Sequence, residues 1–275
     1  MGKLDNKIAL ITGSSRGLGR AIAMKFASEG ARIAINYNKN RKSAEELKNL
    51  LTGSEIFQAD VSNHESVKNM INEIHKKMGT IDILVNNAGI LSTFSWDEFD
   101  DAKVKIIFDT NLMGPIYTTK ECMEDLKKQH GIIINMASNA GVGTAAKGTT
   151  FYSMTKAAVT MLTKRLAFDL MNWHVRVNAI APGWIESDMT VGGKSDEEVN
   201  KLRESFKSKT ELNMTGKPEN IADAAGHFYH IFNYILSVLK DQQFASNTVD
   251  ALRQGKLIMV NVLFLFLQSA HQAPL

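Results

Sequence analysis

The stretch "FYSMTKAAVT" at residues 151–160 places a phenol and an ammonium four residues apart, at Tyr152 and Lys156. Side chains four residues apart lie on the same face of a helix, one turn from each other. A free tyrosine has a pKa of about 10, and a fixed positive charge nearby lowers the pKa of an acid. The spacing therefore suits a phenol that exchanges protons near neutral pH. The same spacing also occurs in ordinary helices, where tyrosine packs in the core and lysine faces solvent.

Short apolar segments alternate with longer amphipathic ones along the chain, and these elements must position the two side chains. The apolar segments are residues 7–12, 31–36, 55–60, 82–87, 131–137 and 174–180, with a seventh predicted at 256–262. Strands that are apolar on both faces and separated by helices predict a parallel sheet covered on both sides. We therefore expect an α/β fold with a doubly wound parallel sheet of about seven strands.

The bulk composition sets limits on the class of protein. The 275 residues contain no internal repeat and no proline-rich linker, so we expect a single domain over residues 1–275. A net charge of +3 without a dense basic run gives no support for nucleic-acid binding. The single Cys122 fits a reducing compartment, and the seven scattered histidines predict no metal site. The most apolar run is about half as long as a membrane helix, so we expect a cytoplasmic protein without a membrane partner.

The first predicted strand leads into the glycine-rich turn "TGSSRGLGRAIA", which contains Gly13, Gly17 and Gly19. Glycine permits positive φ and lets a ligand approach the backbone closely. The following helix N-terminus offers unpaired N–H groups and a partial positive charge. A strand, a turn, a helix and a second strand are the context of a dinucleotide site. The alternative is a tight connection without a ligand, because the spacing is not G-x-G-x-x-G.

The end of the second predicted strand, "AINYNKNRKS", favours NADP(H) over NAD(H). A carboxylate at this place reads the ribose hydroxyls of NAD, but the first acid here is Glu45. Basic and amide residues stand near the predicted ribose pocket instead: Arg16, Asn38, Lys39, Arg41 and Lys42. Cationic groups of this kind recognise a 2′-phosphate, although a solvated basic loop gives the same pattern.

Two polar residues follow predicted strands. Asp60 ends the third strand, where its carboxylate would bond the adenine amino group or cap the helix expected to begin near His64. Ser138 follows the fifth strand, at the edge of the sheet where doubly wound folds bind ligands. Its hydroxyl would hold a substrate oxygen beside the phenol, or would cap a turn.

Asn111 lies in the middle of a long predicted helical stretch, with Gly114 and Pro115 close behind. Asparagine and glycine are unfavourable inside a helix, and proline removes a backbone donor. We therefore expect a local distortion that frees a backbone carbonyl for water. A partly exposed helical asparagine is the alternative.

The motifs occur in a fixed order: "TGSSRGLG", "DV" at 60–61, "NNAG" at 86–89, "TNLMG", "NMASNAG", "YSMTK" at 152–156 and "NAIAPG" at 178–183. Together they resemble the short-chain dehydrogenase/reductase family over roughly residues 5–226. The resemblance implies a Rossmann-like domain carrying both cofactor and substrate sites, and hydride transfer between a nicotinamide and a carbonyl or secondary alcohol. It also implies a set of catalytic positions, which are Asn111, Ser138, Tyr152 and Lys156. In the family, the asparagine position supports a proton relay from the lysine.

The same resemblance implies the residues that contact the cofactor. They are Gly13, Ser15, Arg16, Gly17, Leu18, Gly19, Asn38, Asp60, Val61, Asn87, Ala88, Gly89, Tyr152, Lys156, Pro182, Gly183, Ile185 and Ser187. Within this set, residues 87–89 would lie along the adenine ribose and pyrophosphate. The Ile185 backbone would read the carboxamide, and Ser187 stands where the family often has threonine on the phosphates.

Two segments bear on substrate and assembly. Residues 190–217 predict a mobile flap over the substrate, or an exposed helix pair without a gating role. Residues 241–275 depart from the family ending, because the "DGG" motif is absent. In related proteins this region borders the substrate pocket and a subunit interface, so pocket shape and oligomeric state stay open. The family implies a homodimer or homotetramer.

"PGWIESDM" and "GKPENIADA" resemble 3-oxoacyl-acyl carrier protein reductases and the sugar dehydrogenases close to them. We expect NADPH-dependent reduction of a carbonyl, with a substrate that a carrier can present. Oxidation of a sugar or polyol is the alternative enzyme activity. A dinucleotide-binding regulator without turnover is a third hypothesis, but a pure binder has no need for the phenol.

Overall fold

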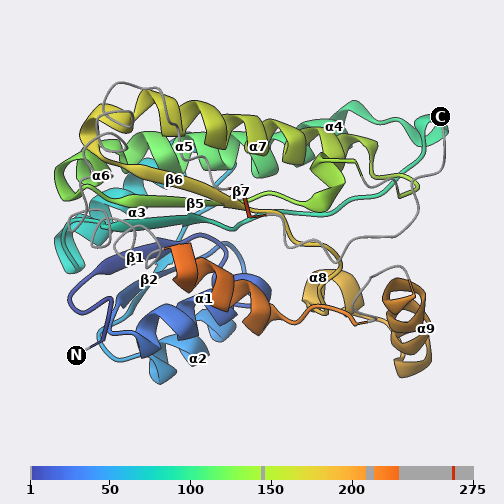
Figure 1. The fold of residues 1–275 in the computed structure, drawn as a ribbon, viewed down its shortest axis with the longest axis horizontal. Coiled ribbons are helices and arrows are strands. Elements are labelled where there is room, and N and C mark those ends of the chain that lie inside the picture. The colour runs from blue at the N-terminus through green and yellow to red at the C-terminus, as the bar shows by residue number, and fades with distance from the viewer. Residues whose placement is uncertain (1, 144–145, 209–213, 229–261, 264–275) are drawn as a thin grey trace, which may run out of the picture.

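Seven parallel strands form one sheet in the order β3-β2-β1-β4-β5-β6-β7 (Figure 1). The computed structural model describes residues 2–143, 146–208, 214–228 and 262–263. The strands are β1 (Ile8–Ile11), β2 (Arg32–Tyr37), β3 (Glu55–Gln58), β4 (Ile83–Asn86), β5 (Ile132–Met136), β6 (Arg176–Ile180) and β7 (Val262–Leu263). The first six overlap the six predicted segments, which confirms the doubly wound parallel sheet. Of the seventh predicted segment, only Val262 lies within the described residues, and it pairs with Ala179.

Helices cover both faces of the sheet (Figure 1). The longer helices are α1 (Gly17–Ser28), α2 (Arg41–Leu50), α3 (His64–Lys77), α4 (Asp101–Phe108), α5 (Gly114–Glu121), α6 (Met123–Gln129), α7 (Thr150–Asp169) and α9 (Asp196–Lys207). The short ones are α8 (Asp188–Val191), the 3₁₀ turns η1 (Trp96–Glu98), η3 (Asn139–Gly141) and η4 (Met171–Trp173), and the π-helix η2 (Asp109–Met113).

Two apolar layers hold the helices to the sheet. On one face, Phe26 of α1, Leu47 of α2 and Ile221 of the helical residues 218–228 pack against the strands. On the other face, Ile74 of α3 and Leu126 of α6 do the same, with α5 and α7 beside them. Strands covered on both sides must be apolar on both faces, which is why the sequence shows continuous Ile and Val runs.

The order of the strands reverses at β1, which pairs with β2 on one side and β4 on the other. The connections after β1 and β4 therefore leave the sheet toward opposite faces. A crevice opens outside the carboxyl ends of the strands at such a point. The predicted motifs follow these strand ends, so the fold brings them to one crevice.

The helical stretch around Asn111 is interrupted, as the sequence predicts. Residues 109–113 form the π-helix η2 between α4 and α5, and Pro115 occupies the first turn of α5. A π-segment inserts extra backbone into a helix, and such segments often occur at functional sites. The Asn111 side chain is buried as a result and faces the interior.

The region of the predicted flap lies beyond the carboxyl end of the sheet, on the side away from α6 (Figure 1). Helix α9 begins after a capping box, in which the Ser195 N–H donates to the Glu198 carboxylate at 2.8 Å. The Arg203 guanidinium of α9 makes two hydrogen bonds of 2.8 Å with the Glu186 carboxylate. A gating role for this region stays a prediction. The atypical segment 241–275 lies outside the described residues, apart from β7.

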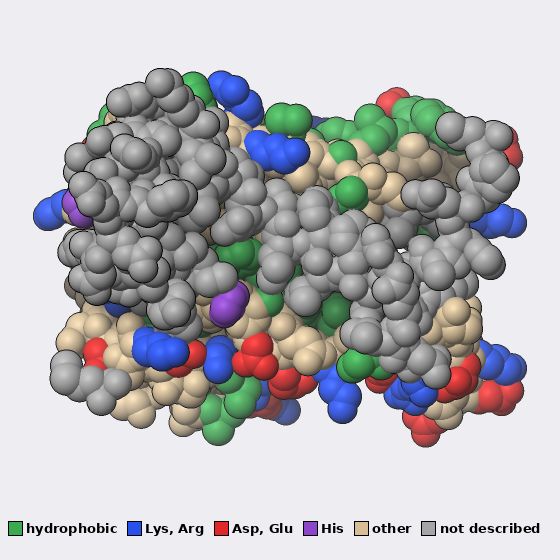
Figure 2. Space-filling model, in the orientation of Figure 1, with side chains coloured by type: hydrophobic (Ala, Val, Ile, Leu, Met, Phe, Trp, Pro, Cys, Tyr) green, Lys and Arg blue, Asp and Glu red, His purple; other side chains and the backbone are tan. Residues whose placement is uncertain are grey.

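The surface carries mixed charge. On the face shown in Figure 2, Lys and Arg side chains are interspersed with Asp and Glu along the lower edge of the molecule. This mixture agrees with the small net charge of +3. Among the described residues, no helix is both long enough and apolar enough to cross a membrane.

Candidate active site

A crevice of about 1440 Å³ runs along the carboxyl ends of β1, β2, β4, β5 and β6. Eighteen of the twenty predicted site residues line it, namely Gly13, Ser15, Arg16, Gly17, Leu18, Asn38, Asp60, Val61, Asn87, Ala88, Gly89, Ser138, Tyr152, Lys156, Pro182, Gly183, Ile185 and Ser187. The other two, Gly19 and Asn111, are buried behind its wall. The structure thus brings together residues from the whole length of the predicted motif set.

The glycine turn between β1 and α1 is shaped for close approach. Gly13 and Gly17 have φ of +63° and +56°, which disfavour any side chain. Space beside Gly17 is open, with no atom within 4 Å of where a Cβ would stand. A Cβ at Gly19 would come within 2.5 Å of the Asn87 amide nitrogen. Gly19 therefore serves the packing of α1 against the β4 end, while Gly13 and Gly17 shape the surface of the crevice.

The N-terminus of α1 faces the same crevice. Its N-cap residue, Arg16, makes no side-chain cap hydrogen bond. The first N–H groups of a helix have no partner within the helix, and they carry its partial positive charge. The residues at this turn therefore fit a pyrophosphate.

Two polar residues that brace this turn were missed by the sequence predictions. The Asn36 side chain accepts from the Gly13 N–H at 2.9 Å and donates to the Ala59 carbonyl at 3.2 Å. The Thr12 hydroxyl accepts from the backbone N–H groups of Asn87 and Ala88 at 2.9 and 3.0 Å. Asn36 carried a visible signal, because it is an amide inside an otherwise apolar strand.

The end of the crevice where the adenine ribose is predicted to bind is lined by Arg16, Asn38, Lys39 and Asp60. Partial burial raises the pKa of the Asp60 carboxyl, but hydrogen bonds from Ser62 and Asn38 and the charge of Lys39 hold it below its ordinary value. Asp60 accepts from the Ser62 N–H at 2.9 Å and so closes a turn. The alternative that Asp60 caps α3 is wrong, because the Asn63 side chain accepts from the Ser66 N–H at that helix start.

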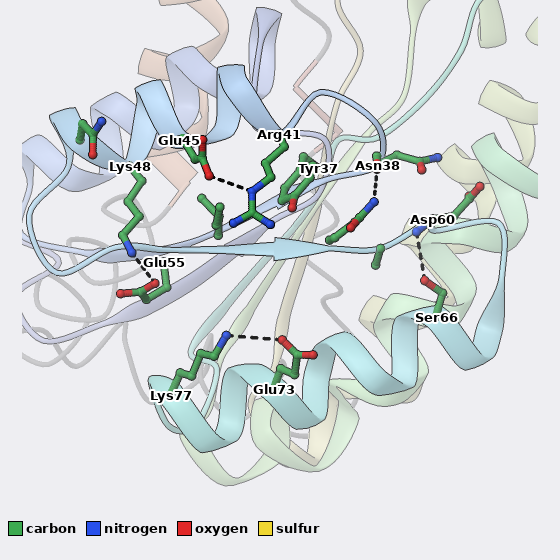
Figure 3. Close-up of a pocket in the computed structure, with 14 residues that line it drawn as sticks. Tyr37, Asn38, Arg41, Glu45, Lys48, Glu55, Asp60, Ser66, Glu73 and Lys77 are labelled. Carbon is green, nitrogen blue, oxygen red and sulfur yellow. Dashed lines mark hydrogen bonds and ion pairs between the residues drawn. The ribbon is translucent and has the colours of Figure 1, made fainter.

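A second groove of about 980 Å³ lies along β3 between α2 and α3 (Figure 3). Arg41 lines this groove and pairs with Glu45 at 2.8 Å, and it is not among the residues that line the first crevice. Lys48 pairs with Glu55 at 2.7 Å in the same groove. Of the basic residues considered for a 2′-phosphate, Arg16 and Lys39 line the crevice, while Arg41 does not.

Tyr152 and Lys156 lie one turn apart on α7, as the sequence predicts. The Lys156 ammonium is 5.7 Å from the centre of the Tyr152 ring and donates to the Met136 carbonyl at 2.7 Å. Ser138 follows β5, and its hydroxyl forms a hydrogen bond with the Tyr152 phenol. The Ser138 hydroxyl also accepts from the Ala140 N–H at 3.2 Å, so it caps η3 as well.

The expected effect of Lys156 on the phenol is not found in the protein alone. Burial raises the pKa of the Tyr152 phenol, and the hydrogen bond from Ser138 offsets only part of this. Burial also lowers the pKa of the Lys156 ammonium to about 8. Desolvation therefore opposes charge on both groups in the protein alone, and a phenol that is acidic near neutral pH stays a prediction.

Asn111 supports the floor of this site. Its side chain exchanges two hydrogen bonds with the Ile90 backbone, accepting at 2.8 Å and donating at 2.9 Å. It also donates to the Thr155 hydroxyl of α7 at 3.3 Å. A Cβ at Gly89 would lie 3.2 Å from the Asn111 side-chain oxygen and 3.6 Å from the Lys156 nitrogen. Glycine at this position therefore leaves the two groups room to converge.

The end of the crevice beyond Tyr152 is mostly apolar. The Trp184 and Phe206 rings stack with centres 4.9 Å apart, which joins the β6 end to α9. Apolar side chains that line this end include Leu91, Ile106, Trp184, Met189, Phe206 and Met214. Phe206 and Met214 belong to the predicted flap, and the other four were not predicted to form a site. Within the described residues, no group of three His, Cys, Asp or Glu side chains is arranged to hold a metal ion.

Comparison of the sequence with models of known protein families identifies its family. The sequence model described as "short chain dehydrogenase" matches residues 7–198. The chain belongs to the short-chain dehydrogenase/reductase family. Because this is a family of oxidoreductases, the protein is an enzyme of that class.

Several relatives of this family member cover most of its length. It is 38% identical over 227 residues to a 3-oxoacyl-[acyl-carrier-protein] reductase FabG of Staphylococcus aureus, which spans 79% of the chain and 88% of that protein. It is 36% identical over 234 residues to the FabG of Aquifex aeolicus, spanning 80% and 89%. A short chain dehydrogenase from Burkholderia cenocepacia, solved in complex with NADP, is similar with a TM-score of 0.76 and 28% identity, covering 82% of this chain and 91% of that one.

Proposed function

We propose that this short-chain dehydrogenase/reductase uses NADP(H) to reduce a 3-oxoacyl thioester, presented on a carrier, to the 3-hydroxyacyl product. The observation that carries the proposal is that Ser138, the partly buried Tyr152 and Lys156 line one crevice, whose other end is the glycine turn. The identity to FabG proteins supports the substrate class.

Each side chain has a distinct part in the proposed reaction. The Ser138 hydroxyl donates to the substrate carbonyl oxygen and holds it beside the phenol. The Tyr152 hydroxyl gives its proton to that oxygen as negative charge develops on it. Lys156 and Asn111 stand behind the phenol, where the buried ammonium stabilises the phenolate left by the transfer.

A reduced nicotinamide nucleotide would supply the hydride when bound. The glycine turn and the α1 N-terminus would hold its pyrophosphate, and the residues after β4 and β6 would meet its adenosine and nicotinamide sides. Arg16 and Lys39 would meet a 2′-phosphate. The positive charge of the oxidised ring would act with Lys156 on the phenol, which the protein alone leaves weakly acidic.

The apolar end of the crevice favours an acyl chain over a sugar. The stacked Trp184 and Phe206 offer apolar contact area, and Met189 and Met214 offer adaptable packing. A sugar needs several hydrogen-bonding side chains around its ring, so oxidation of a sugar or polyol is the weaker candidate. One domain would carry both cofactor and substrate sites.

We also propose that the protein is cytoplasmic and forms a homodimer or homotetramer. Met154, Met161 and Phe168 are exposed on one face of α7, at intervals of seven residues, which suits burial against a second copy. Light scattering during gel filtration would measure the mass of the assembly, and a monomer would contradict this part of the proposal.

The direct test is to add NADPH or NADH with a panel of 3-oxoacyl thioesters, simple ketones and sugars, and to follow the reduced nicotinamide absorbance. We expect the highest kcat/KM with NADPH and a 3-oxoacyl thioester. Turnover only with sugars would contradict the substrate class, and nucleotide binding without turnover would support a regulator.

The cofactor preference can be tested with two arginine variants. Arg16→Ala should lower the ratio of NADPH to NADH affinity about tenfold, because one charge-assisted hydrogen bond to a phosphate is lost. Arg41→Ala is the matched control, since Arg41 is paired with Glu45 and does not line the crevice. An equal effect of both substitutions, measured by nucleotide fluorescence titration, would reject this account of the ribose pocket.

A further inference from the structure

Two histidines meet at the amino end of the sheet, on the rim opposite the crevice. Ile132 of β5 pairs with Arg176 of β6, and His130 and His174 each stand two residues before their paired strand. The parallel register therefore places the two histidines side by side. Both side chains are exposed, and the ring centres are 5.5 Å apart with planes at 74°.

Both histidines adopt the left-handed backbone conformation, with φ of +51° at His130 and +57° at His174. His130 ends α6 and His174 ends η4. Glycine or asparagine is the usual residue at such a helix end, although histidine is tolerated there. The backbone geometry therefore does not by itself require an imidazole at either position.

One imidazole of the pair is fixed by a hydrogen bond. The His130 Nδ1 atom lies 2.9 Å from the Trp173 carbonyl oxygen. A carbonyl oxygen only accepts, so Nδ1 carries the hydrogen and Nε2 keeps a lone pair in the neutral ring. Histidines that bind metals usually donate their other ring N–H to a backbone carbonyl in this way, which fixes the tautomer and the ring orientation.

The distance between the rings suits a shared ion. Two imidazoles that bind one metal at about 2.0–2.1 Å have ring centres roughly 5 Å apart. The observed separation of 5.5 Å is close to this value, and the exposed His174 side chain is free to change rotamer. Nearby charges are Lys127, whose ammonium lies 4.4 Å from the centre of the Trp173 ring, and Glu124, which pairs with Lys127 at 3.3 Å. This pairing offsets the lysine charge that a cation would meet.

We propose that His130 and His174 bind a divalent transition-metal ion of the imidazole-preferring kind, with water completing its coordination. Cu²⁺ should bind most tightly of this group, followed by Ni²⁺ and Zn²⁺. The site joins the starts of β5 and β6 and is made only when these strands pair. Metal binding therefore stabilises the folded state by mass action and contributes no atom to the reaction.

The test is a titration of the full chain with Cu²⁺, followed by tryptophan fluorescence. Cu²⁺ quenches nearby indoles, and Trp173 adjoins both histidines. We expect saturable partial quenching in the native protein, at least tenfold weaker Cu²⁺ affinity in His130→Asn and in His174→Asn, and displacement by Zn²⁺. Asparagine keeps the left-handed preference, so both variants retain the backbone.

His75→Asn is the matched control, because His75 is a further exposed histidine on α3, where it pairs with Asp125 at 2.7 Å and does not adjoin His130 or His174. It should bind Cu²⁺ like the native chain. Should either variant unfold, amide NMR of the native protein decides, with Cu²⁺ broadening expected at residues 130–131 and 173–175. Absence of saturable quenching, equal affinity in all variants, or broadening elsewhere alone would overturn the proposal.

Discussion

The polar side chains at the two ends of strands β5 and β6 differ in their exposure to solvent. At the carboxyl rim, Ser138 and Lys156 are buried, with exposed fractions of 8% and 6%. At the amino rim, His130 and His174 are exposed. Burial changes the acidity of a group, as the pKa of about 8 for the Lys156 ammonium shows. Exposure leaves a pair of lone-pair donors open to ions from solution.

The largest expected effect is a loss of catalytic rate when the site at the carboxyl rim is changed. Tyr152→Phe removes the proton donor at the carboxyl rim, so kcat should fall roughly 100- to 10,000-fold, the usual range for a general acid. Nucleotide affinity should change less than about threefold, since the ring and its packing remain. Steady-state kinetics and a nucleotide titration measure the two quantities. An active variant would contradict the role of the phenol.

A second prediction concerns the pH dependence of stability caused by buried Lys156. Its folded pKa is about 8 and its ordinary value 10.5, so the unfolded chain binds the extra proton between these values. The free energy of unfolding of the native chain, relative to Lys156→Met, should therefore rise by up to about 3 kcal/mol as pH increases through this window. Urea unfolding of both proteins across the window measures it. A pH-independent difference would show that the ammonium is solvated.

A smaller effect is expected at the Glu186–Arg203 pair, which joins the carboxyl rim to α9. Hydrogen bonds from Arg203 and Thr215 lower the pKa of Glu186 to about 2 from 4.5. The stability that this pair provides is present above pH 4.5 and is lost as pH falls toward 2. Because the pair is partly exposed, Arg203→Gln should lower the free energy of unfolding only slightly near neutral pH, and less in acid.

Unfolding of the Arg203→Gln variant at neutral and acidic pH checks this. Lys201→Gln in the same helix is the control, since its exposed pair with Glu197 should contribute almost nothing. A loss of equal size in the control would assign the effect to helix α9 in general.

No effect on catalysis is expected from a substitution at the amino rim. His130→Asn alters the amino rim only, so kcat and KM for the best substrate should match those of the native chain. Parallel assays with and without Zn²⁺ measure this. A change in kcat would show that the two rims are coupled through β5, and would contradict the separation drawn here.

The sequence predicts the elements and the main site well because both depend on local patterns. Apolar runs predicted the positions of six strands, and the Tyr152–Lys156 spacing predicted that both side chains lie on one face of α7. The distortion at Asn111 followed from asparagine, glycine and proline in one helical stretch. Each of these signals lies within a few neighbouring residues.

What the sequence could not predict depends on contacts between distant residues. The Asn36 and Thr12 side chains brace the glycine turn across 23 and 75 residues. The direction of the Tyr152 pKa depends on desolvation by elements that fold around α7. The register of β5 and β6 places His130 beside His174. The hydrogen bond between the His130 ring and the Trp173 carbonyl likewise joins residues 43 positions apart.

The π-helix η2 fixes the length of the chain between two anchors. On one side, Asn111 is tied to the Ile90 backbone, and on the other the Thr118 hydroxyl donates to the Asn86 side chain. Loss of Leu112 or Met113, which lie in η2 between Asn111 and Thr118, would rotate one anchor about the helix axis by roughly 100° relative to the other. Deletions and insertions in this segment should therefore be selected against, even where every remaining side chain is unchanged.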